Sequence, residues 1–166
     1  MENKNIKQKL LRNPLIRIIL GLLVCFAAFI VTQNIASKLL GLTGIDKDFR
    51  NLIKGILASI AVIIAYNFFY RKIESREVTE ISVKGIAKNL TLGLIIGVAL
   101  QSLTVLVIYL NNGFKVVSIN PVSFIIIPLT VAFTVAIFEE ILIRGILFRI
   151  IEEKLGSYIA LIISAI

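Results

Sequence analysis

The feature that most constrains this sequence is a series of four long apolar runs, because about 20 apolar residues can cross a bilayer as a helix. The run from Leu90 to Leu110 has 21 residues and no charged side chain. The others are Ile18 to Ile35, Leu52 to Tyr70, and a run from Val122 that stays uncharged to Phe138. Backbone polar groups in lipid must be paired internally, which favours helices here. The sequence therefore predicts an all-α fold, a polytopic transmembrane helix bundle with four full spans.

A fifth apolar run, Ser157 to Ile166, follows Gly156 and is ten residues long. At about 1.5 Å per residue it covers roughly half of a ~30 Å hydrocarbon core. We interpret it as a partial fifth span. We therefore expect residues 1–166 to be a single membrane domain, the N-terminal part of a longer one.

The composition excludes other classes of protein. The chain is 58% hydrophobic and 17% charged, whereas soluble domains are about half apolar and a quarter charged. Its net charge of +8 lies between the apolar runs and not in an aromatic-rich basic patch, which argues against a nucleic-acid partner. The expected partners of these cations are the headgroups of the lipid bilayer.

The basic residues also predict the orientation. A cytoplasmic N-terminus places thirteen Lys and Arg residues inside and five outside, in agreement with the positive-inside rule. The first loop departs from this rule, since it would lie outside and yet carries Lys38, Lys47, Arg50 and Lys54. The second loop, residues 71–89, mixes glutamates with apolar residues. It fits either an amphipathic surface helix or a solvated linker.

One cluster of ionisable residues, Glu139, Glu140 and Arg144, interrupts the fourth apolar run. Ionisable side chains in such sequence are costly and are functional candidates. Glu140 and Arg144 are four positions apart, so they can pair on one helix face. Glu139 has Ile143 at that spacing and lacks such a partner. An unpaired carboxylate in apolar surroundings binds a proton more readily, so Glu139 could take a proton from water.

A simpler alternative is that the fourth span ends at Phe138 and the cluster lies at the membrane interface. Depth distinguishes the two interpretations. Counted from Val122, Glu139 lies about 26 Å along a helix, close to the far interface; counted from Pro128, it lies about 17 Å along. Apolar residues continue to Ile151 and favour the second count, with a motif-bearing helix at about 122–151. Arg149, near Glu152 and Glu153, is expected at a solvated helix end.

The segment from Glu139 to Arg144 matches the EExxxR motif of the CPBP family, the CAAX-protease and bacteriocin-processing intramembrane endopeptidases. The sequence resembles that family from Glu139 to Ile166, including Gly145 after the arginine and Leu155-Gly156 before the next apolar run. Ile143 departs from the family pattern, in which an aromatic residue is common at this position.

The resemblance implies that Glu139 is the general base that activates water, and that Glu140 and Arg144 form a charge pair that orients the site. It also implies histidines on later helices, whereas this sequence has no histidine. No cofactor is identifiable in the chain. Zinc, which the resemblance allows for the full-length family, would need those histidines.

Two functions follow. The first is an intramembrane endopeptidase that hydrolyses peptide or protein substrates, in peptide maturation or in self-immunity to bacteriocins. Because the sequence contains no histidine, we expect the 166-residue chain by itself to be incomplete and inactive. The second is a non-catalytic membrane immunity or interaction protein, or an inactive remnant. Abundant Ile, Lys and Asn fit an AT-rich bacterial genome and hence a bacterial cytoplasmic membrane.

Overall fold

The computed structural model describes residues 13–78 and 85–165, and the chain divides into two compact units. Unit 1 comprises residues 1–78 and 123–166, and unit 2 comprises residues 79–122. Every regular element of the described residues is a helix: α2 (Pro14–Gly41), α3 (Lys47–Phe68), η1 (Phe69–Ile73), α4 (Ile86–Leu110), η2 (Val122–Ile125), α5 (Ile126–Glu139), η3 (Glu140–Phe148), α6 (Arg149–Leu155) and α7 (Ser157–Ser164). The predicted all-α fold is confirmed.

Among the described residues, four stretches are long and apolar enough to cross a membrane: Pro14–Gly41, Lys47–Ile73, Ile86–Leu110 and Val122–Leu155. They confirm the four predicted spans and extend each of them. The first begins early because the Asn13 side chain accepts a hydrogen bond from the Leu15 amide and Pro14 suits the first helical turn. In the fourth, α5 begins at Ile126, between the two starting points considered above.

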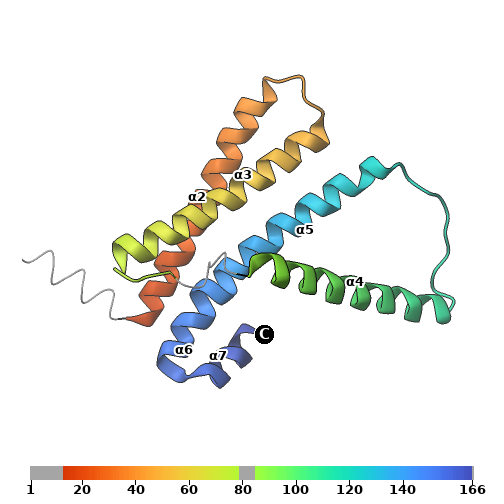
Figure 1. The fold of residues 1–166 in the computed structure, drawn as a ribbon. Coiled ribbons are helices and arrows are strands. Elements are labelled where there is room, and N and C mark those ends of the chain that lie inside the picture. The colour runs from red at the N-terminus through yellow and green to blue at the C-terminus, as the bar shows by residue number, and fades with distance from the viewer. Residues whose placement is uncertain (1–12, 79–84, 166) are drawn as a thin grey trace, which may run out of the picture. The chain divides into compact units, whose positions relative to one another are not determined.

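In unit 1, α2 and α3 form an antiparallel pair, and α5 packs along the other side of α3 (Figure 1). The largest fully buried side chains are Tyr66, Tyr70 and Phe69 of the second span and Ile146 and Ile150 of the fourth. Phe138 packs between Phe26 and Phe29 of α2, with ring centroids 5.0 Å from each. The motif-bearing helix is therefore held by contacts with both α2 and α3.

A charged cluster of Arg17, Glu74, Arg149 and Glu153 connects three segments at one end of unit 1. Arg17 donates to both Glu74 oxygens and to Glu153, each at 2.8 Å. Arg149 pairs with Glu153 and lies 3.5 Å from Glu74. The guanidinium of Arg149 also lies 4.5 Å from the centroid of the Tyr70 ring. Arg149 is buried, so its prediction as part of a solvated helix end is wrong.

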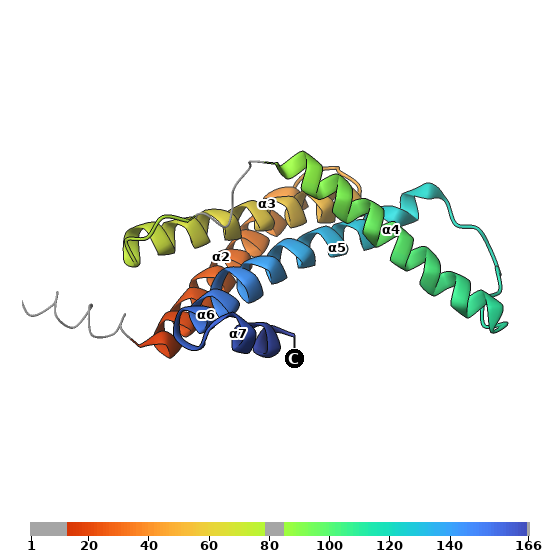
Figure 2. The same cartoon turned by 60° about the horizontal axis from the view of Figure 1, so that its bottom comes forward.

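The partial fifth span is a short helix, α7, that turns back along the chain from which it comes. Gly156 makes this reversal with φ of 83° and ψ of 166°, a conformation open to glycine. Its amide donates to the Glu152 carbonyl and its carbonyl accepts from Ala160. As a result α7 packs against α6 and η3 (Figure 2).

The described part of unit 2 contains α4, which is long and apolar enough to cross a membrane. The second loop is described only in part. Helix η1 ends at Ile73, residues 74–78 are not helical, and α4 begins at Ile86. The amphipathic surface helix considered for the second loop is therefore not present within residues 74–78, and residues 79–84 lie outside the described part of the chain.

Candidate active site

The predicted site residues lie where the fourth span changes its helical geometry. Glu139 is the last residue of α5, and Glu140 is the first residue of η3, a π-helix of nine residues. In a π-helix each amide donates to the carbonyl five residues earlier. Such segments are rare in proteins, and those that occur are often found at functional sites. No pattern in the sequence indicates this change, because periodicity alone does not separate a π-helix from an α-helix over nine residues.

Gly145 holds the π-helical segment against α3. The Tyr66 hydroxyl donates to the Gly145 carbonyl at 3.0 Å, and Arg149 Nε donates to the same oxygen at 3.2 Å. A Cβ at position 145 would lie 2.9 Å from Tyr66 Cε2, closer than side-chain carbons pack. Since the Tyr66 ring is buried, it has little room to move. Glycine at this position therefore allows the ring to rest on the helix backbone.

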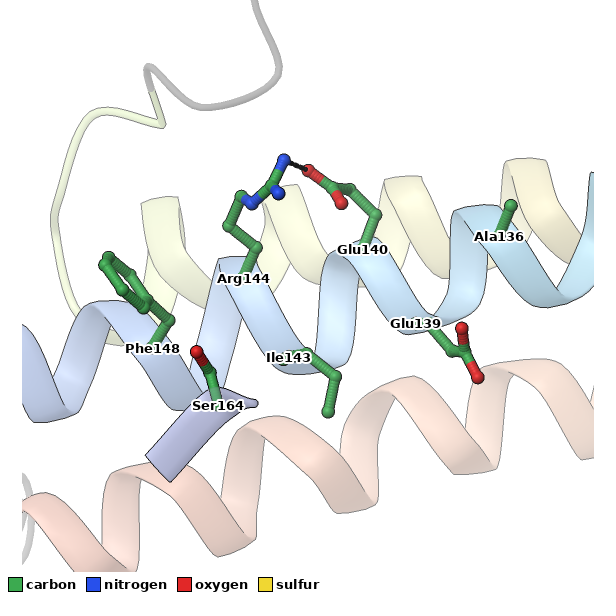
Figure 3. Close-up of a pocket in the computed structure, with 7 residues that line it drawn as sticks. All are labelled: Ala136, Glu139, Glu140, Ile143, Arg144, Phe148 and Ser164. Atoms are coloured by element: carbon green, nitrogen blue, oxygen red, sulfur yellow. Dashed lines mark hydrogen bonds and ion pairs between the residues drawn. The ribbon is translucent and has the colours of Figure 1, made fainter. Parts of the chain in front are cut away.

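Glu140 and Arg144 form the ion pair that their spacing predicts. Arg144 Nη1 donates to Glu140 Oε1, and the two side chains project from the same side of the helix (Figure 3). Their side chains are 56% and 74% exposed. An exposed pair of this kind contributes little to stability.

Glu139 projects from a different side of the helix from this pair (Figure 3). Its side chain is exposed in this structure. The reason is that Phe138, one residue earlier, fills the interior, and successive helical residues are about 100° apart. Within the described residues, no ion pair or hydrogen bond joins the Glu139 carboxylate to another side chain.

The three site residues line one open cavity of about 480 Å³. Its lining is Ala136, Glu139, Glu140, Ile143, Arg144, Phe148 and Ser164. The cavity thus brings together an unpaired carboxylate, a carboxylate–guanidinium pair and a hydroxyl, between apolar walls. Charged side chains in membrane spans face protein interiors or water-filled cavities, so this face of the helix is suited to admit water.

Ser164 is a residue of this cavity that the sequence did not predict. Its hydroxyl donates to the Leu161 carbonyl at 3.0 Å, and it joins the cavity because α7 folds back toward η3. The signal in the sequence is faint. Ser157 and Ser164 are the two serines of the run from Ser157 to Ile166, which is apolar apart from them and Tyr158.

The residues of the cavity do not suit zinc. Zinc favours four ligands drawn mainly from thiolates and imidazoles, and the cavity offers two carboxylates. Over residues 13–78 and 85–165, no three His, Cys, Asp or Glu side chains come together as a metal site.

Comparison with known proteins agrees with this geometry. Residues 120–166 match the family model described as type II CAAX prenyl endopeptidase Rce1-like. This segment contains the π-helix, all residues that line the cavity, and α7. No curated protein and no solved structure matches the chain. The match confirms the resemblance to the CAAX-protease and CPBP intramembrane endopeptidases that the EExxxR motif predicted.

Proposed function

We propose that this chain acts in hydrolysing peptide bonds at the membrane, because the segment around Glu139 matches a family of CAAX prenyl endopeptidases. Glu139, Glu140 and Arg144 are its proposed site residues. One observation carries the proposal. Two adjacent carboxylates line the same cavity, one paired with a guanidinium and the other unpaired. Such a difference in environment is how two acids of one site acquire different roles.

In the proposed reaction, Glu139 accepts a proton from a water molecule while the water oxygen bonds to the scissile carbonyl carbon. The tetrahedral intermediate then collapses. Its carbon–nitrogen bond breaks, and the proton passes from Glu139 to the departing amine. Arg144 holds Glu140 in place through their ion pair. The pair fixes the electrostatic field around Glu139 and serves as a positioning element.

The biological role that we propose is maturation of a peptide or self-immunity to a bacteriocin, in a bacterial cytoplasmic membrane with the N-terminus inside. The support is the excess of Lys and Arg on the proposed cytoplasmic side and the bacterial character of the composition. Residues 1–166 are proposed to act as one membrane domain, although they divide into two compact units.

The test introduces the substitution into the chromosomal gene, so that the protein is assayed in the form that the cell itself produces. Membranes are incubated with a quenched fluorogenic peptide library. Glu139→Gln keeps the shape of the side chain and removes the base, so cleavage should fall at least about 100-fold. The matched control is Glu77→Gln, an exposed glutamate outside the cavity, which should cleave as the parent does. Cleavage that Glu139→Gln leaves intact would contradict the proposal.

A second candidate function, a non-catalytic immunity or interaction protein, is favoured by one observation: the 166 residues include no histidine. The same strains distinguish the two. A non-catalytic protein protects cells from a bacteriocin equally well with Glu139→Gln, whereas a protease loses protection together with cleavage.

A further inference from the structure

A second cavity lies at the other end of unit 1, between the last turns of α2 and the first turns of α3. We name it the basic cavity. It has a volume of about 230 Å³ and is lined by Ser37, Leu40, Gly41, Lys47, Arg50, Asn51 and Lys54. None of these residues belongs to the site around Glu139.

The charged side chains that line the basic cavity are all positive. Three cations, Lys47, Arg50 and Lys54, share it with the polar side chains of Ser37 and Asn51 and with no carboxylate. The acids of the adjoining turn lie outside it. Asp46 caps α3 by accepting a hydrogen bond from the Asp48 amide at 2.9 Å. Among the described residues, these three cations form no ion pair.

The spacing of the cations explains why they meet in one cavity. Positions 47, 50, 51 and 54 recur every three or four residues, so they lie on one face of α3. That face packs beside the end of α2, which supplies Leu40 and Gly41. Arg50 and Lys54 are partly buried, so their repulsion is less screened than at a fully exposed surface. An anion in the cavity would relieve this repulsion.

The position of the basic cavity along the membrane normal indicates which anion could reach it. Helix α2 has 28 residues and is about 42 Å long, which exceeds the ~30 Å hydrocarbon core and matches a bilayer with its headgroups. An end of the α2–α3 pair therefore lies at the level of lipid phosphates. Water occupies about 30 Å³ per molecule, so 230 Å³ accommodates a phosphate group with several waters.

We propose that the basic cavity binds a phosphate group, supplied by the headgroup of an anionic phospholipid. Arg50 offers a planar fork that can donate two hydrogen bonds to phosphate oxygens. Lys47 and Lys54 add point charges, and Asn51 and Ser37 add neutral donors. The proposal also accounts for the unexpected basic residues of the first loop, three of which line the cavity.

The experiment measures phospholipid retention by native mass spectrometry on the full chain in detergent. The probes are phosphatidylglycerol, phosphatidylcholine and inorganic phosphate. The parent should retain phosphatidylglycerol over phosphatidylcholine. The variant Lys47→Gln/Arg50→Gln/Lys54→Gln should lose about five-fold in affinity for phosphatidylglycerol per cation removed. The matched control, Arg71→Gln/Lys72→Gln/Lys154→Gln, removes one Arg and two Lys outside the cavity and should bind as the parent does.

The inorganic phosphate arm identifies the source of the phosphate. If phosphate does not displace phosphatidylglycerol, the lipid is the ligand; if millimolar phosphate displaces it from the parent, free phosphate is a ligand of the same site. Asn51→Asp gives an independent test that keeps all three cations, and its added carboxylate should weaken phosphatidylglycerol binding. Equal binding by the triple variant and its control, or unchanged binding by Asn51→Asp, would overturn the proposal.

Discussion

The guanidinium of Arg17 donates a hydrogen bond to each carboxylate oxygen of Glu74, with Nε–Oε1 and Nη2–Oε2 distances of 2.8 Å. The two residues are 57 positions apart in the chain. Glu74 is 6% exposed and lies next to a second arginine, Arg149. One carboxylate therefore fixes the start of α2 to the end of the fourth span. The helix that carries the candidate site is anchored at this point.

Glu74→Gln should strongly destabilise unit 1. The substitution leaves Arg17 and Arg149 to share the single charge of Glu153, and removing one partner of a buried ion pair typically costs about 3–5 kcal/mol. The free energy of unfolding, measured by denaturant titration in detergent, checks this. The control is Glu77→Gln, three positions away and exposed, with an expected change within about 0.5 kcal/mol. Similar stability of the two variants would show that the charged cluster does not hold the fold.

Gly145→Ala should be destabilising by about 1–3 kcal/mol, because the added Cβ overlaps the Tyr66 ring. Tyr66→Phe, which keeps the ring and removes the hydroxyl donor, should cost about 1 kcal/mol. Thermal unfolding followed by circular dichroism measures both effects. Gly97→Ala in α4 is the matched control, since no atom lies within 4 Å of its added Cβ. We expect it to be neutral or slightly stabilising. If both alanine variants unfold alike, the contact at Gly145 is not tight.

Arg144→Gln should separate activity from stability. The Glu140–Arg144 pair is exposed, so its loss should change the free energy of unfolding by at most about 1 kcal/mol. If the pair positions the site, cleavage should fall with a lower kcat and little change in KM. Arg144→Lys, which keeps the charge and loses the planar fork, should recover part of the activity. A rise in KM at constant kcat would instead make the pair a substrate-binding element.

The proposed orientation places Lys72 in the cytoplasm and Asn112 outside, because it sets the N-terminus inside. Fusions of alkaline phosphatase, active outside, and of green fluorescent protein, fluorescent inside, measure this at each position. We expect fluorescence at Lys72 and phosphatase activity at Asn112. The opposite pattern would reverse the topology and place the site cluster at the outer side of the membrane.

The parts of this fold that the sequence predicts are those that depend on local pattern. Hydropathy located the four spans, and spacing located the Glu140–Arg144 pair, because both follow from neighbours along one helix. The burial of Arg149 was not predicted, since it depends on Glu74 and Tyr70 from another span. The direction of Glu139 likewise depends on another span. It follows from the packing of Phe138 against α2, which no local pattern contains.

Because the chain turns back at Gly156, α7 lies against the helix that precedes it, and the number of residues after the turn determines how far α7 extends along that helix. Distance from the turn decides which residue of α7 reaches the cavity, and at seven residues beyond Ser157 that residue is Ser164. One added helical turn, about 5.4 Å, would move Ser164 past its present place and bring forward a residue from about one turn earlier, such as Ala160 or Leu161. The chemical character of one cavity wall is thus set by chain length after a single glycine, and can change without any change at Glu139, Glu140 or Arg144.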